Sequence, residues 1–136
     1  MNYTEVLSGV WVSDVQLLQN RDFMIDNQID IILNCTQYYD FPSVEAQKIR
    51  LPFSPNVSDE TNLQMLKQNK SQIVRFLKDH MQDHNILISC YDGKCISPMI
   101  VALLIQEISD INSSSIFDIL KIYNPQFQLW CDLRSF

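Results

Sequence analysis

The segment that decides the fold is Asn85–Gln106, which reads NILISCYDGKCISPMIVALLIQ. Its first residues are mostly apolar and predict a buried strand, while the apolar run after Pro98 predicts a buried helix. Ser97 suits a helix N-cap and Pro98 suits the first helical position, so we expect the helix to begin there. Cys90 therefore stands between the end of a strand and the N-terminus of a helix.

The rest of the chain alternates strands with helices. Ile29–Thr36 (IDIILNCT) is a near-continuous apolar run, typical of a strand covered on both faces, and Gln47–Phe53 (QKIRLPF) is a more polar strand stopped by proline. A short strand is expected around Gly9–Trp11. Further helices are expected within 14–27, after Asp59, at 113–123 and from Asn124–Pro125 onward. We therefore expect one α/β domain over residues 1–136, with a central mixed, largely parallel sheet of four to five strands flanked by helices.

The composition is that of an ordinary globular domain, with 46% hydrophobic and 19% charged residues and a formal charge of −6. This negative charge argues against binding to nucleic acid or to an anionic membrane. No apolar run reaches the roughly 20 residues of a membrane helix, and the N-terminal residues do not resemble a signal peptide. The four cysteines are expected to be free thiols. The sequence thus predicts a cytoplasmic protein without a cofactor.

The loop from Cys90 to Ser97 has features of an anion site. Backbone N–H groups that point inward ahead of a helix N-terminus attract negative charge. The same field favours the thiolate of a cysteine at the start of the loop, and a thiolate can attack phosphorus to form a covalent intermediate. Gly93 permits the positive φ that such a tight loop requires. The chemistry expected here is phosphate binding or phosphoryl transfer.

Cys90, Gly93 and Ser97 fit the signature H-C-x-x-G-x-x-R-S/T, and the chain resembles the small dual-specificity branch of the cysteine-dependent protein tyrosine phosphatases. The segments SGVWVSDV, IDIILNCT and NPQFQLW are similar to the flanking parts of that family. The resemblance implies a dual-specificity phosphatase-like fold, Cys90 as the nucleophile, and Asn34 and Ser89 as supports of the loop. It also implies a phosphate loop made of Cys90, Tyr91, Asp92, Gly93, Lys94, Cys95, Ile96 and Ser97.

Two residues of the signature are missing: Ser89 replaces the histidine, and Ile96 replaces the arginine. In the family this arginine binds two phosphoryl oxygens. Charge-assisted hydrogen bonds are worth about 1.5–3 kcal/mol each, so losing two costs roughly 3–6 kcal/mol, or about 10²–10⁴ in rate. Lys94 is a nearby cation, but it lacks the planar fork of arginine and sits two positions early. It is either a makeshift replacement or an exposed surface lysine.

The resemblance also implies an aspartate that acts as general acid on a loop upstream of the cysteine. Counting back about thirty residues from Cys90 gives Asp59, whereas aligning on RLPFSP puts Pro55 at this position. Asp59 is also a good N-cap for the helix that follows. The sequence leaves both alignments open.

Two other groups of residues have alternative interpretations. The resemblance implies that Cys35, on the strand next to that of Cys90, or Cys95 in the loop could form a redox pair with Cys90; otherwise both are ordinary thiols. His80 and His84 are four residues apart, a spacing that can bind a metal, but no third ligand accompanies them, so we interpret them as a surface pair without a metal.

Three functions follow from these observations. The first is a pseudophosphatase, a catalytically inactive protein that binds a protein partner, with a phosphoprotein as one option. The second is a slow or specialised phosphatase that hydrolyses phosphoserine, phosphothreonine or phosphotyrosine through Cys90. The third is a structural or assembly protein that keeps only the fold. The missing arginine and histidine favour the first and third.

Overall fold

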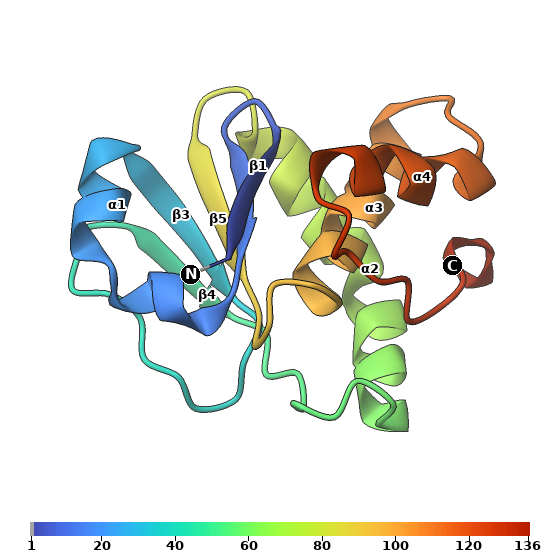
Figure 1. The fold of residues 1–136 in the computed structure, drawn as a ribbon, viewed down its shortest axis with the longest axis horizontal. Coiled ribbons are helices and arrows are strands. Elements are labelled where there is room, and N and C mark those ends of the chain that lie inside the picture. Colours follow the sequence, from blue (N-terminus) through green and yellow to red (C-terminus); the bar gives the residue numbers. More distant parts are fainter. Residues whose placement is uncertain (1) are drawn as a thin grey trace.

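The structure, a computed structural model, describes residues 2–136 and is built on a five-stranded sheet (Figure 1). The strand order is β1-β2-β5-β3-β4. The first pair is antiparallel, and the remaining neighbours are parallel. The strands are β1 (Tyr3–Leu7), β2 (Val10–Ser13), β3 (Ile29–Asn34), β4 (Gln47–Arg50) and β5 (Asn85–Ser89). The predicted mixed, largely parallel sheet is therefore confirmed.

Helices cover both faces of this sheet, as Figure 1 shows. One face is covered by the 3-10 helix η1 (Val15–Gln19) and by α1 (Arg21–Asp26), and the other by α2 (Glu60–His80), α3 (Ile96–Ile108) and α4 (Ser113–Tyr123). A second 3-10 helix, η2 (Leu133–Ser135), ends the chain. No helix in the described part is long and apolar enough to cross a membrane.

Side-chain alternation along the interior strands explains the two layers. In β3, Ile31 and Leu33 pack into the larger core with α2, α3 and α4, whereas Ile32 packs into the smaller core with η1 and α1. In β5, Leu87 joins Ile32 on the smaller side. Successive residues of a strand point to opposite faces, so an all-apolar strand must be covered on both.

Several boundaries differ from the sequence predictions. The strand expected around Gly9–Trp11 is β2, and β1 before it was not predicted because Tyr3–Leu7 is a polar edge strand with one fully buried side chain. Helix α3 begins at Ile96 with Cys95 as its N-cap, so the prediction that Ser97 is the cap is wrong. The Ser97 hydroxyl lies instead 3.1 Å from the Cys90 sulfur.

The α-helix predicted from Asn124–Pro125 onward is also wrong. The residues after α4 form a turn and an extended segment before η2. The Asn124 side chain accepts from Gln126 N and closes the turn, and Gln128 N then donates to Lys94 O at 2.8 Å. These tertiary hydrogen bonds tie the segment to the Cys90–Ser97 loop, which explains why the proline start does not lead into a helix.

Candidate functional site

The carboxyl ends of β2, β5 and β3 meet at the Cys90–Ser97 loop. The parallel registers place Ser13 beside Ser89 and Ser89 beside Asn34. The next residues continue this alignment, because Cys35 N donates to Ser89 O and Cys90 N donates to Ser13 O. In sheets that contain parallel strands, this edge is where ligands usually bind.

Cys90 lies at the bottom of the loop and is completely buried. Its sulfur is 3.1 Å from Ser97 Oγ, and Ser97 N donates to it at 3.4 Å. These hydrogen bonds favour the thiolate, but burial outweighs them and raises the pKa of the thiol above its usual value. Asp92 adds to this increase through its negative charge. Both burial and the charge of Asp92 therefore act against the nucleophilic thiolate form of Cys90.

Asp92 places a carboxylate inside the loop. Its Oδ1 accepts from Lys94 N at 2.9 Å and lies 3.8 Å from the Cys90 sulfur. Its Oδ2 lies 3.7 Å from the Cys95 sulfur. A phosphate that approached this sulfur would lie close to the carboxylate of Asp92, which is exposed at the surface of the loop. Its negative charge therefore opposes an anion at this position.

Ile96 occupies the position of the signature arginine and offers no charge to this site. Its side chain is only 1% exposed and belongs to the larger core. As the first residue of α3, it faces the packed interior. The charged groups of the loop are therefore the carboxylate of Asp92 and the ammonium of Lys94, beside the two buried sulfur atoms of Cys90 and Cys95. Lys94 does not offset burial at Cys95, where burial and Asp92 raise the pKa to about 11.

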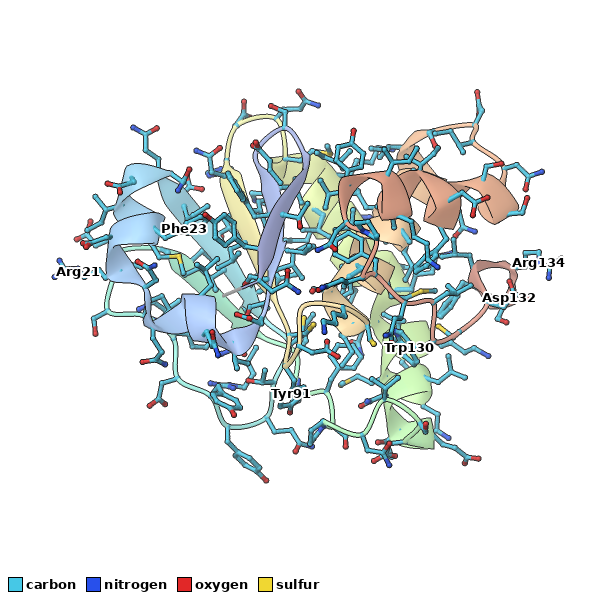
Figure 2. The ribbon with its side chains drawn as sticks, viewed as in Figure 1. Arg21, Phe23, Tyr91, Trp130, Asp132 and Arg134 are labelled. Carbon is cyan, nitrogen blue, oxygen red and sulfur yellow. The ribbon has the colours of Figure 1, made fainter. Side chains whose placement is uncertain are left out.

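The loop is fixed from outside by its neighbours. Gly93 has a φ of +68°, and an added Cβ would lie 2.7 Å from Asp14 N, so this position requires glycine. On the other side, Trp130 Nε1 donates to Cys95 O at 3.1 Å, next to the bond between Gln128 and Lys94. Figure 2 shows Trp130 on the C-terminal segment beside the loop. The backbone of the loop is thus held without an arginine.

Tyr91 connects the loop to two other segments. Its hydroxyl donates to Phe53 O at 2.6 Å and accepts from Gln37 N at 3.0 Å. Asn34 acts through the same turn, because its side chain donates to Tyr39 O and accepts from Thr36 Oγ1. Support of the loop by Asn34 would therefore be indirect, through residues 36–39. Ser89 instead donates to Asp14 O and ties β5 to the start of η1.

Sequence reasoning missed the role of Arg50 at this edge of the sheet. Its guanidinium donates to Thr36 O at 3.0 Å and to Tyr39 O at 2.8 Å, and it lies over the Phe41 ring. It therefore holds the turn that contacts Tyr91. The sequence carried no signal for this role, because the parallel register that puts Arg50 beside Asn34 at the carboxyl end of β4 is known only from the structure.

Asp59 is the N-cap of α2, and its carboxylate accepts from Thr61 N and Thr61 Oγ1. The hydrogen bond from the Thr61 backbone is the main cause that lowers the pKa of Asp59. A general acid must hold its proton near neutral pH, so this shift opposes that role. Within residues 2–136, Asp59 makes no hydrogen bond to the loop. Pro55, the alternative position, has no acidic group and lies exposed at the surface.

The other cysteines are free in the structure. Cys35 is completely buried, and its pKa is raised well above the usual value by burial and, secondarily, by Cys90. That influence places Cys35 near Cys90, so a redox pair stays a prediction. Among the described residues, no three His, Cys, Asp or Glu side chains gather to hold a metal. His84 pairs with Asp30 at 2.9 Å.

Known structures of phosphatases resemble this chain over almost its whole length. DUSP15 matches with a TM-score of 0.82 and 16% identity, over 98% of this chain and 83% of that one. The human tyrosine phosphatase-like serine/threonine/tyrosine-interacting protein gives 0.81 and 12%, over 98% and 91%. A leucine-rich-repeat and phosphatase-domain-containing protein from Entamoeba histolytica gives 0.79 and 15%, over 98% and 89%.

At the level of sequence, a scan against protein-family models finds no match, and neither does a search of curated proteins. The structural similarity nevertheless extends over five strands and the helices on both faces. The chain therefore has a dual-specificity phosphatase-like fold, as the resemblance of its sequence implied.

Proposed function

We propose that this chain is a pseudophosphatase, a catalytically inactive protein with the dual-specificity phosphatase fold that acts by binding a protein partner. The observation that carries the proposal is the carboxylate of Asp92, which accepts from Lys94 N beside the Cys90 sulfur. A phosphate group at this sulfur would lie close to a negative charge. Ile96 then offers no charge to hold the phosphate that enters, because its side chain is buried in the core.

The state of the two expected catalytic groups supports the same proposal. Burial raises the pKa of the Cys90 thiol, which disfavours the thiolate, and the hydrogen bond from the Thr61 backbone lowers the pKa of Asp59, which disfavours its protonated form. Phosphoryl transfer through a phosphocysteine needs the opposite state of both groups, a thiolate nucleophile and a protonated acid. One of the similar structures is of a human protein whose name calls it phosphatase-like and interacting. We place this chain in the same functional class and in the cytoplasm.

The binding function can be tested by capture from a lysate of the native host. The immobilised protein is incubated with untreated lysate and with lysate treated with a phosphatase, and bound proteins are quantified by mass spectrometry. Capture of the same partner at a fixed molar ratio supports the proposal, and loss after phosphatase treatment identifies the partner as a phosphoprotein. A structural or assembly role predicts capture that does not depend on phosphate. No enrichment over an unrelated immobilised domain would contradict a binding function.

One observation favours a second function, a slow phosphatase. Ser97 contacts the Cys90 sulfur through both its hydroxyl and its backbone N–H, and these contacts lower the pKa of the thiol against the effect of burial. If Asp92 moved away, the N–H groups of the loop could receive a phosphate, with Lys94 as the cation. This function requires hydrolysis that disappears when Cys90 is replaced by serine.

A further inference from the structure

The positive charge of this acidic chain is concentrated on α2. This helix holds four of the ten Lys and Arg residues but only two of the sixteen Asp and Glu residues, which gives it a formal charge of +2 in a chain of −6. The four cations are Lys67, Lys70, Arg75 and Lys78. Charge of one sign that gathers on one element attracts a partner of opposite sign, even when the protein as a whole is repelled by it.

The helical period brings these cations to one side of α2. Lys67, Lys70 and Lys78 lie three and eleven residues apart, so all three point in nearly the same direction from the helix axis, with Arg75 at the border of this face. Val74 lies in the middle of the stripe and is buried against the core. Lys67 and Lys78 are exposed and Lys70 is half-buried, so the three cations lie around the buried Val74.

A groove of about 410 Å³ opens along this row. Lys70, Arg75 and Lys78 line it together with Ser71 and Val74, and Asp79 and Glu107 form part of its wall. Within residues 2–136, Arg75 and Lys78 make no ion pair, and the Lys70 ammonium lies 6.0 Å from the centre of the Phe136 ring. At least two guanidinium or ammonium groups in the groove are thus available to another molecule.

We propose that this groove, which we call the α2 groove, is a docking site for an acidic peptide segment of a partner protein. The lining has three cations and two carboxylates, so a single small anion gains little there. A peptide that runs along α2 can place one carboxylate among Lys70, Arg75 and Lys78 and a second one near Lys67, outside the groove. Its apolar side chains can contact Val74.

The α2 groove is separate from the loop of the proposed function. The loop precedes Ile96 at the start of α3, whereas Glu107 is the penultimate residue of that helix. At 1.5 Å per residue the two are about 16 Å apart along the helix axis. Docking in the groove therefore does not depend on whether the loop binds phosphate, and failure of one proposal leaves the other in place.

The test uses a short fluorescein-labelled peptide in which Glu alternates with Ala, and fluorescence anisotropy at low salt. The groove variant carries Lys70→Gln, Arg75→Gln and Lys78→Gln. The matched control carries Arg21→Gln, Lys48→Gln and Lys121→Gln, all of which are exposed and lie on other elements. Both variants remove one Arg and two Lys, which lowers the formal charge from −6 to −9. Circular dichroism and thermal melting check that both are folded.

We expect the groove variant to bind the peptide about tenfold or more weakly than the unmodified protein, and the control to change by less than about twofold. Added salt should weaken binding to the unmodified protein and should hardly affect the groove variant. Equal losses in both variants would overturn the proposal, because bulk charge would then explain binding. It would also be overturned if the unmodified protein did not bind the peptide, if it bound single-stranded oligonucleotide more tightly, or if only self-association depended on the groove.

Discussion

The two ends of α3 differ in what they offer an anion. At its N-terminal end, the Cys90–Ser97 loop directs the Ser97 N–H toward the Cys90 sulfur but has no arginine, and the carboxylate of Asp92 already accepts from Lys94 N. Near its C-terminal end, the α2 groove has three cations but no loop of N–H groups. The backbone geometry of an anion site and the charge that would hold an anion are thus separated in this fold. Dual-specificity phosphatases are expected to combine them, as the signature of Cys, Gly and Arg indicates.

The largest effect should come from restoring the missing cation. Ile96→Arg places a charge where the side chain is 1% exposed and packed in the larger core, so we expect the free energy of unfolding to fall by about 3–5 kcal/mol. Ile96→Val, the matched control, should cost about 0.5–1.5 kcal/mol. Urea denaturation measures both. An Ile96→Arg variant as stable as the control would mean that the arginine side chain can turn toward the loop. A single substitution would then bring a cation back to the backbone of the loop.

A smaller loss is expected when the backbone of the loop is disturbed. Gly93→Ala adds a Cβ at a φ of +68°, 2.7 Å from Asp14 N and 2.8 Å from the Ser13 carbonyl carbon, so we expect a cost of at least about 2 kcal/mol. Gly9 also has a positive φ, but the nearest atom to an added Cβ is the side-chain oxygen of Asn85 at 3.0 Å. Gly9→Ala should therefore cost about 1 kcal/mol. Equal unfolding energies for the two variants would show that the loop is not fixed by its contact with β2.

The next effect concerns phosphate affinity. Asp92→Asn removes the carboxylate that lies 3.8 Å from the Cys90 sulfur, so we expect inorganic phosphate to bind about tenfold more tightly than to the unmodified protein. Asp22→Asn, on the far face of the sheet in α1, makes the same change in net charge and should have no effect. Isothermal titration calorimetry or chemical shifts of the loop amides provide the measurement. If both variants bind phosphate as the unmodified protein does, Asp92 does not block the loop.

The smallest effect is expected in the reactivity of Cys90 at neutral pH. Because burial raises the pKa of its thiol in the folded state, the neutral form predominates up to a pH above the usual value near 9. The rate of alkylation by iodoacetamide should therefore stay low from pH 6 to pH 9 and rise only above that range. Mass spectrometry of the peptides distinguishes Cys90 from the other three cysteines. Fast alkylation with a plateau below pH 7 would show a stabilised thiolate and would favour the slow phosphatase.

The same raised pKa has a consequence for stability. The unfolded chain loses the Cys90 proton near the usual thiol value, while the folded chain still holds it. The contribution of the Cys90 thiol to the free energy of unfolding is therefore fully present below about pH 9. It declines as the pH rises from the pKa of the thiol in the unfolded chain toward its pKa in the folded chain. Cys35 has a pKa raised in the same direction and should add to this decline.

Much of the fold could be predicted from local patterns. The mostly apolar strand Ile29–Asn34 required cover on both faces, and the strand before Cys90 required a helix after it. The predicted C-terminal helix does not form because Gln128 and Trp130 make hydrogen bonds to the loop, and no local pattern reveals partners 34 and 35 residues away. Tertiary contacts of this kind override helix propensity.

The position of the site could be predicted from the sequence, but the placement of the Asp92 carboxylate and the pKa of Cys90 could not. The sequence placed Cys90, Gly93 and Ser97 in one loop and showed that Ile96 carries no charge. It could not show how close the exposed carboxylate of Asp92 lies to the Cys90 sulfur, because that distance depends on the tertiary fold of the loop. The pKa of Cys90 likewise depends on how completely the surrounding elements bury it.

We infer that the Cys90–Ser97 loop does not transfer phosphate. The decisive measurement is the turnover of an aryl phosphate with an acidic leaving group. Such a substrate needs no general acid, so only Cys90 and the loop matter. The unmodified protein and Cys90→Ser are compared between pH 5 and pH 8, together with a search for phosphocysteine by mass spectrometry after rapid acid quenching. We expect equal background rates for both proteins and no phosphocysteine. Hydrolysis that the unmodified protein shows and Cys90→Ser lacks, or a trapped phosphocysteine at position 90, would contradict it.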